Sequence, residues 1–169
     1  MRAVILCAGS GTRMLNSSGD SHKSLLPINE NHSFLSRILH QFIEYNFDEV
    51  VLVTGYNSHL IEYEITKFQL PIKIVHNSLF EQDTNIWSMK LALDNISNHQ
   101  EPVLIIEADT YISNQSFNSV IQNLKKNIST WFTKELFSES EVGGVLKKDR
   151  SNNVQDIRIL KEYDNKYIE

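Results

Sequence analysis

The sequence predicts an α/β fold, a Rossmann-like and mostly parallel sheet with helices on both faces and a β-rich C-terminal part. Two observations predict this fold. Up to Asn127, short apolar runs alternate four times with amphipathic helical patterns, and the links between them are short. Beyond Asn127 the helical patterns stop, and strand-like runs are separated by Gly-Gly and Ser-Asn-Asn turn signals.

The first element is the run Ala3 to Cys7, which is apolar without interruption and therefore typical of a strand buried on both faces. The next elements are, in chain order, a helix over Ser33 to Tyr45 with Ser33 as N-cap, a strand over Val50 to Thr54, a helix through Leu60, Ile61, Ile65 and Phe68 that Pro71 ends, a strand over Ile72 to Val75, a helix from about Asn85 to Leu93, a buried strand over Val103 to Ile106, and a helix capped by Ser116 that continues through Leu124. In the C-terminal part, strands are expected over Ser129 to Thr133, Val142 to Lys147 and Val154 to Leu160.

Composition indicates one globular domain over residues 1–169. The chain has 41% hydrophobic and 22% charged residues, and its net charge of −5 argues against a broad basic face for nucleic acid. Cys7 is the single cysteine, so a disulfide framework is excluded and a buried thiol is expected. Because no apolar run has the length of a signal sequence or a membrane span, we expect a cytoplasmic protein without a membrane partner.

A phosphate-binding loop is indicated where the first strand ends, in the run Ala8-Gly9-Ser10-Gly11-Thr12-Arg13. Its glycines let a ligand approach bare backbone amides, and successive amides form a concavity that suits phosphate oxygens. Arg13 adds a planar charged group and Lys23 a mobile one. The spacing does not fit a P-loop, and Met14 stands where a dinucleotide-binding loop has its third glycine. The glycines alone also fit an ordinary strand-to-loop turn.

Acidic residues follow the fourth predicted strand. Asp109 comes just after it, where an oxygen ligand suits Mg²⁺ together with substrate phosphates. Glu107 lies two residues earlier and points to the same face of an extended chain, so it is expected to bind the metal, hold its water or pair with Lys23. The alternative for Asp109 is a helix cap or turn residue, and the alternative for Glu107 is a purely structural role. Since ligands of parallel sheets bind beyond the carboxyl ends of the strands, the glycine loop, the segment 77–85 and Asp109 are expected to converge.

Two further segments have polar or aromatic groups suited to a substrate. Asn85 both donates and accepts hydrogen bonds, as the edge of cytosine requires, although Asn85 and Ser88 would equally serve as caps of the helix that follows. Trp131 and Phe132 would wall an acceptor pocket, in which a Trp face attracts a quaternary ammonium group, or would lie in the core.

The pattern Leu-x-Ala-Gly-x-Gly-Thr-Arg-Met, followed after a gap by Lys-x-Leu-Leu-Pro-Ile, resembles the signature of nucleotidyltransferases that join a nucleoside triphosphate to a phosphorylated small molecule. These are the sugar-phosphate nucleotidylyltransferases and the phosphocholine cytidylyltransferases of bacterial surface-polymer synthesis, which have a GT-A-like fold. Sugar-nucleotide enzymes usually carry a Gly-Thr pair where this chain has Asp83-Thr84-Asn85-Ile86-Trp87-Ser88, and this run is more similar to the phosphocholine type.

The resemblance implies transfer of a nucleoside monophosphate, CMP from CTP before other nucleotides, to an acceptor such as phosphocholine with release of pyrophosphate. It implies catalytic roles for Arg13 and Lys23, Mg²⁺ as cofactor on Asp109 with Glu107 as support, and nucleotide binding by Ala8, Gly9, Ser10, Gly11, Thr12, Arg13, Asn77, Thr84 and Asn85. The alternatives are a sugar-1-phosphate nucleotidylyltransferase using UTP, dTTP or GTP, a nucleotide-binding member without turnover, and an unrelated α/β protein.

Members of that family generally continue well past this length, and their later segment supplies a second metal-binding carboxylate and much of the acceptor site. We therefore expect a single nucleotidyltransferase domain over residues 1–169 that is either shortened on its C-terminal side or completed by an acceptor half from elsewhere. The oligomeric state is open, with a homo-oligomer among the options.

Overall fold

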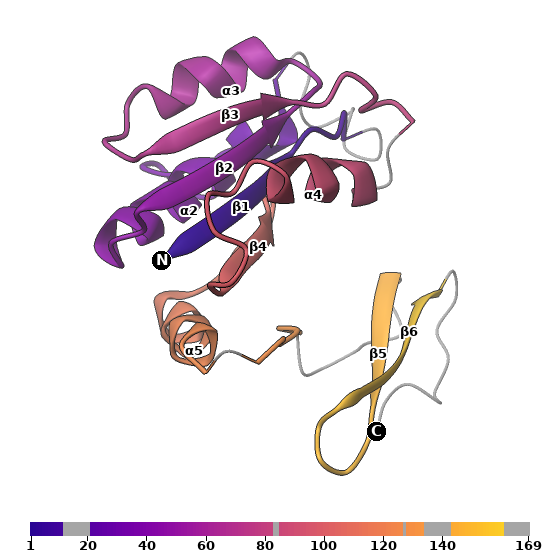
Figure 1. Cartoon of the computed structure of the whole chain (residues 1–169). Coiled ribbons are helices and arrows are strands. Elements are labelled where there is room, and N and C mark those ends of the chain that lie inside the picture. The colour runs from indigo at the N-terminus through magenta and orange to yellow at the C-terminus, as the bar shows by residue number, and fades with distance from the viewer. Residues whose placement is uncertain (12–20, 83–84, 127, 134–142, 161–169) are drawn as a thin grey trace. The chain divides into compact units, whose positions relative to one another are not determined.

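The computed structural model describes residues 1–11, 21–82, 85–126, 128–133 and 143–160 (Figure 1). The chain divides into two compact units, Met1–Thr130 and Trp131–Glu169, and each is described by itself. That residues 1–169 form one nucleotidyltransferase domain stays a prediction. No helix among these described residues combines the length and apolar character needed to cross a membrane.

A four-stranded parallel sheet in the order β3-β2-β1-β4 forms the centre of the first unit. Its strands are β1 (Arg2–Cys7), β2 (Glu49–Thr54), β3 (Ile72–His76) and β4 (Val103–Glu107). Val4 on β1 is in register with Val51 on one side and Ile105 on the other. Because all four strands run in the same direction, their carboxyl ends lie at one edge, which confirms the predicted mostly parallel sheet.

Helices cover both faces of this sheet, as predicted (Figure 1). The helices α2 (Phe34–Glu44), α3 (Ser58–Ile65) and α5 (Asn114–Leu124) pack on one face, and α4 (Ile86–Leu93) packs on the other. Ile5 points into the first layer and Val4 into the second, since successive side chains of a strand alternate. Both are fully buried, which confirms β1 as the strand covered on both faces.

The start of α2 follows directly from its sequence. Ser33 accepts the amide of Ser36 at 3.1 Å, and the Ser36 hydroxyl accepts the amide of Ser33 at 2.8 Å. This reciprocal capping box satisfies two amides that a helix start otherwise leaves unpaired. Ser33 is therefore confirmed as the N-cap. Further along α2, Phe42 is buried and its ring stacks on Phe47 with centroids 4.3 Å apart.

Three predictions about elements were wrong. The N-cap of α5 is Ser113 and not Ser116, because Ser113 has the extended backbone of a cap and accepts the Ser116 amide at 3.1 Å. The fourth strand is buried on one face only, since Ile105 on its other face is 40% exposed. Residues 129–133 form no strand, and the first strand of the second unit begins at Gly143.

The second unit contains an antiparallel hairpin of β5 (Gly143–Lys148) and β6 (Val154–Leu160), which agrees with the predicted β-rich C-terminal part. The Asp149 carboxylate closes its turn, accepting the amides of Ser151 and Asn153 at 2.8 and 2.9 Å. Asn152 has a φ of 64°, a left-handed conformation that Asn tolerates well.

We expect Phe42→Ala to lower the free energy of unfolding by about 3 to 5 kcal/mol, because it removes a buried ring and leaves a cavity between α2 and α5. Urea unfolding followed by circular dichroism measures the change. The matched control is Ile43→Ala on the same helix, whose side chain is 41% exposed and should lose less than about 1 kcal/mol. Equal losses in the two variants would contradict this account of the core.

Candidate functional site

The glycine loop leaves β1 at the carboxyl edge of the sheet, and contacts from β2 hold it in place. The amide of Tyr56 donates to the carbonyl of Ala8 at 3.0 Å. A Cβ atom added to Gly55 would lie 2.7 Å from the same carbonyl and 2.7 Å from Phe80 Cβ, so only glycine fits there. Gly55 and Tyr56 are supporting residues that the sequence analysis missed. The signal that could have found them is a glycine placed directly after the second strand.

Lys23 lies across this loop and reaches the end of β4. It begins the short 3-10 turn η2 (Lys23–Leu25), and its aliphatic stem packs on Gly11, where an added Cβ would come within 3.2 Å of Lys23 Cδ. Gly11 has a φ of 65°, so glycine is favoured there by the backbone as well. At its far end, Lys23 Nζ lies 2.9 Å from Asp109 Oδ2. The fold thus brings together three predicted parts of the site: glycine loop, cation and carboxylate.

A buried polar network lies beneath Lys23. His22 Nδ1 accepts the amide of Ser24 at 3.2 Å and lies 2.8 Å from the Ser24 hydroxyl, which is 3.3 Å from Cys7 Sγ. Burial, together with repulsion from Lys23, lowers the pKa of His22 to about 4. Cys7 is buried, which confirms the expected buried thiol, and this burial raises the pKa of the thiol to about 12.

The His22 ring is neutral and buried, and it bonds the Ser24 backbone next to Lys23. Since Nδ1 accepts a hydrogen bond, the proton of the ring lies on Nε2, which is buried without a hydrogen-bond partner among the described residues. The nearby carbonyl groups of Cys7 and Gly9 act to raise the pKa of His22 and so oppose its lowering. A protonated ring would place a buried positive charge beside Lys23, which is itself positively charged. The sequence analysis did not identify His22 as part of the site.

Glu107 contacts Asn85 and not Lys23. Asn85 Nδ2 donates to Glu107 Oε1 at 2.8 Å. Asn85 occupies the N-cap position of α4, but its side chain makes no capping hydrogen bond. The alternative that Asn85 serves only as a helix cap is therefore wrong. The two carboxylates after β4 have different partners, Asp109 with Lys23 and Glu107 with Asn85.

The other predicted site residues fall into two groups. Asn77 is fully buried, where it donates to Ser88 Oγ at 2.9 Å and accepts the amide of Leu79 at 2.9 Å, so it fastens the loop after β3 to α4. Its contact with a nucleotide stays a prediction. Ala8, Gly9, Ser10 and Gly11 form the described part of the glycine loop, whereas Thr12, Arg13 and Thr84 lie outside the described residues.

Trp131 and Phe132, the residues predicted to wall an acceptor pocket, lie in neither of the environments that were expected. Trp131 and Phe132 are 63% and 46% exposed and lie outside any strand, so neither the strand nor the core alternative holds. Across the described ranges, no group of three or more His, Cys, Asp or Glu side chains is placed to hold a metal ion.

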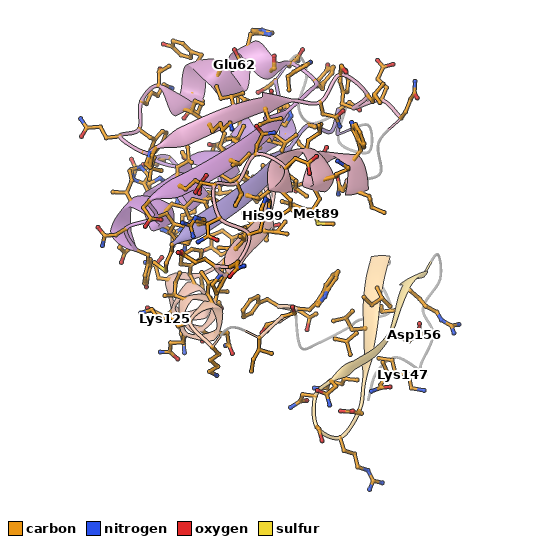
Figure 2. All side chains as sticks on the ribbon, viewed as in Figure 1. Glu62, Met89, His99, Lys125, Lys147 and Asp156 are labelled. Atoms are coloured by element: carbon orange, nitrogen blue, oxygen red, sulfur yellow. The ribbon has the colours of Figure 1, made fainter. Side chains whose placement is uncertain are left out.

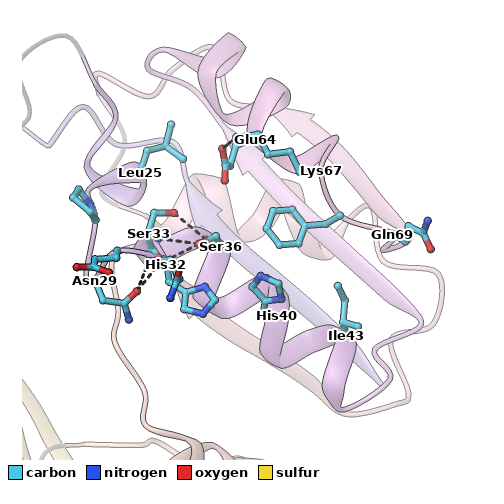
Figure 3. A pocket seen from close by; sticks show the side chains of 14 residues that line it. Leu25, Asn29, His32, Ser33, Ser36, His40, Ile43, Glu64, Lys67 and Gln69 are labelled. Atoms are coloured by element: carbon cyan, nitrogen blue, oxygen red, sulfur yellow. Dashed lines mark hydrogen bonds and ion pairs between the residues drawn. The ribbon is translucent and has the colours of Figure 1, made fainter.

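A groove of about 840 Å³ lies between α2, the turn that precedes it and the residues that follow α3 (Figure 3). Ser33 and Ser36 line it, but both are engaged in the capping box. The rings of His32 and His40 pack there edge to face. The pKa of His40 is lowered, mainly by burial and to a smaller extent by repulsion from His32 and Arg37. Of the described loop residues 8–11, none lines this groove. We place the candidate site at the strand ends, because the complementary charges meet there.

The chain matches one family model and is similar to several known proteins. Residues 21–157 match a family model described as "Domain of unknown function (DUF6564)". The choline-phosphate cytidylyltransferase of Haemophilus influenzae is 32% identical over 117 residues, which are 69% of this chain and 47% of that protein. The enzyme of the same name from Streptococcus pneumoniae is 25% identical over 120 residues, 70% of this chain and 49% of that protein.

Solved structures show the same fold. The CTP:phosphocholine cytidylyltransferase from Streptococcus pneumoniae superimposes with a TM-score of 0.66 and 19% identity, covering 94% of this chain and 64% of that one. The chain spans about half the length of the curated cytidylyltransferases that it matches, 47% and 49%. The GT-A-like nucleotidyltransferase fold that the sequence predicts is confirmed.

We expect His22 to make stability depend on pH. Because its pKa is about 4 in the folded protein and about 6.5 when unfolded, the neutral ring contributes stability above pH 6.5 that is lost as the pH falls toward 4. This loss should be on the order of 2 kcal/mol. Thermal or urea unfolding at several pH values measures it.

The variant His22→Asn keeps an acceptor for the Ser24 amide but does not titrate, so its stability should fall less between pH 6.5 and 4 than that of the unaltered protein. The control His59→Asn, at an exposed position of α3, should keep the original slope. The same pH dependence in His22→Asn and the unaltered protein would contradict the prediction.

Proposed function

We propose that this chain, which belongs to the DUF6564 family and to the nucleotidyltransferases, transfers a nucleoside monophosphate to a small phosphorylated acceptor and releases pyrophosphate. In its specific form, the donor is CTP, the acceptor is an alcohol phosphate such as phosphocholine, and Mg²⁺ is required. The observation that carries the proposal is Lys23, which packs on the glycine loop and pairs with Asp109 at 2.9 Å.

The reaction needs charge neutralisation and alignment more than proton transfer. An oxygen of the acceptor phosphate attacks the α-phosphorus, the bond from that phosphorus to the bridging oxygen of the β-phosphate breaks, and pyrophosphate leaves. Since the attacking oxygen is already anionic, no general base is required. Bare amides of Gly9 to Gly11 would bind phosphate oxygens, with Arg13 as a further predicted contact, and Lys23 would neutralise charge at the transferred group.

The residues at the strand ends fit a magnesium ion. Mg²⁺ is commonly held by one or two carboxylates, substrate phosphates and water, and Asp109 offers a carboxylate that is 26% exposed beside the glycine loop. The ion would supply positive charge that neutralises the polyphosphate. Lys23 and Asp109 are each other's counter-ion here, and binding of a magnesium polyphosphate would give each of them a new partner of opposite charge.

Two features favour CTP and a choline-type acceptor. The two curated relatives quoted above are named choline-phosphate cytidylyltransferases. Asn85 lies at the same sheet edge through its bond to Glu107, and an amide side chain matches the edge of cytosine. A sugar-1-phosphate nucleotidylyltransferase is the second candidate, because a bifunctional GlmU protein of Methanococcus aeolicus is 28% identical over 158 residues, 94% of this chain and 36% of that protein.

Pyrophosphate release with a panel of triphosphates and acceptors tests the proposal. Turnover confined to CTP and phosphocholine with Mg²⁺ would support the specific form. Turnover with UTP, dTTP or GTP and a sugar 1-phosphate would support the second candidate. Calorimetric binding of CTP without pyrophosphate release would indicate a nucleotide-binding protein without turnover. Absence of binding to every triphosphate would reject the proposal.

We expect Lys23→Met to lower the rate of pyrophosphate release by about 10²- to 10³-fold, because it removes a fixed cation from developing negative charge. Steady-state kinetics at saturating Mg²⁺ measures the effect. The control Lys125→Met lies at the exposed end of α5 and should keep the original rate (Figure 2). A folded Lys23→Met protein with unchanged turnover would remove Lys23 from the mechanism.

A further inference from the structure

The orientation of Asn85 is fixed by a partner that a helix cap does not need. Asn85 has a left-handed backbone, with φ 72° and ψ −22°, directly before α4. A side chain at this position usually accepts an amide of the first helical turn, but that of Asn85 donates to Glu107 Oε1 instead. Its amide group is thereby directed toward the carboxyl end of β4.

This pair belongs to the same rim as the glycine loop. Glu107 is the last residue of β4, and Asp109 follows two positions later. Asp109 binds Lys23, whose stem packs on Gly11. A continuous series of contacts therefore connects the loop proposed for the polyphosphate with Asn85. A nucleotide bound along this rim would have its phosphates at the glycine loop and its base near α4.

The carboxylate decides which end of the amide faces a ligand. An ionised carboxylate only accepts hydrogen bonds, so it must meet the NH₂ group of Asn85 and not the carbonyl oxygen. Within the described residues, the bonds of the Asn85 side chain involve Nδ2 alone. Oδ1 is consequently presented as an acceptor, next to a carboxylate that also accepts. Without Glu107, the amide could turn by 180° and present its NH₂ group instead.

We propose that Glu107 is a positioning residue that holds the Asn85 amide with its oxygen outward and thereby favours a base with an exocyclic amino group over one with a carbonyl in its place. CTP and UTP are the matched ligands, because the 4-amino group of cytosine donates where the 4-carbonyl of uracil only accepts. The carbonyl of uracil would meet two acceptors, and neither could bond it. This inference rests on the proposed function and names how its site selects the base.

Equilibrium binding of CTP and of UTP, each with Mg²⁺, measures the selectivity without requiring turnover. The unaltered protein should bind CTP at least about tenfold more tightly than UTP, as expected for one well-oriented donor–acceptor match. In Glu107→Gln, which keeps the size of the side chain but can donate to Asn85 Oδ1, the ratio should fall to within about threefold. The control Glu62→Gln, on the exposed side of α3, should keep the original ratio (Figure 2).

A double-mutant cycle tests whether Glu107 acts through Asn85. The variant Asn85→Ala should lose the selectivity as well, and adding Glu107→Gln to it should leave the CTP-to-UTP ratio unchanged. A purely structural role of Glu107 would lower both affinities equally and keep the ratio, which would overturn the proposal. A role as metal ligand would raise the Mg²⁺ concentration needed for CTP binding while the ratio stays the same, and would overturn it too.

The outcomes separate this inference from the proposed function. If the unaltered protein binds CTP and UTP equally well, the inference fails while nucleotide binding stands. If it binds no triphosphate at all, both fail together. If it selects CTP and Glu107→Gln keeps that selectivity, the function stands and Glu107 is not the positioning residue.

Discussion

The parallel pairing of β1 with both of its neighbours is the constraint on which the site depends. Because β1 is in register with β2 and β4, the loops that follow these three strands leave the sheet at one edge. The amide of Tyr56 can then reach the carbonyl of Ala8, and Lys23 can reach from the glycine loop to Asp109. Burial of β1 on both faces holds this register, since a slip by one residue would exchange the side chains that face its two helical layers.

The Lys23–Asp109 ion pair suits a site that has to open. Both side chains keep about a quarter of their surface in solvent, 22% and 26%. In the proposed function, a ligand that offers each group a new counter-charge would replace this pair. The neutral His22 beneath it avoids a second positive charge, because burial lowers its pKa to about 4.

Most of the fold could be predicted because its signals are local. The apolar run of β1, the Ser33 cap and the glycine loop each depend on residues close together in the chain. Ser113 and Ser116 show where local signals stop, since either serine could cap α5. The choice is made by packing, because a helix whose first backbone bond joins Phe117 to Ser113 places Phe117 in the core. Likewise, the exposure of Ile105 depends on α4, which packs mainly over β1 and β2 and leaves Ile105 of β4 partly exposed on that face.

The sequence by itself determined the order of strands and helices, the loop with bare amides, and the charged groups available at the strand ends. It left open whether Glu107 meets a metal, a water or Lys23, and whether Asn85 is only a cap. The tertiary structure decided that Glu107 bonds Asn85 while Asp109 bonds Lys23. The physical reason is that these partners are far apart in the chain. The distances between their side chains are set by the pairing of β4 with β1 and by the packing of α4 on one face of the sheet.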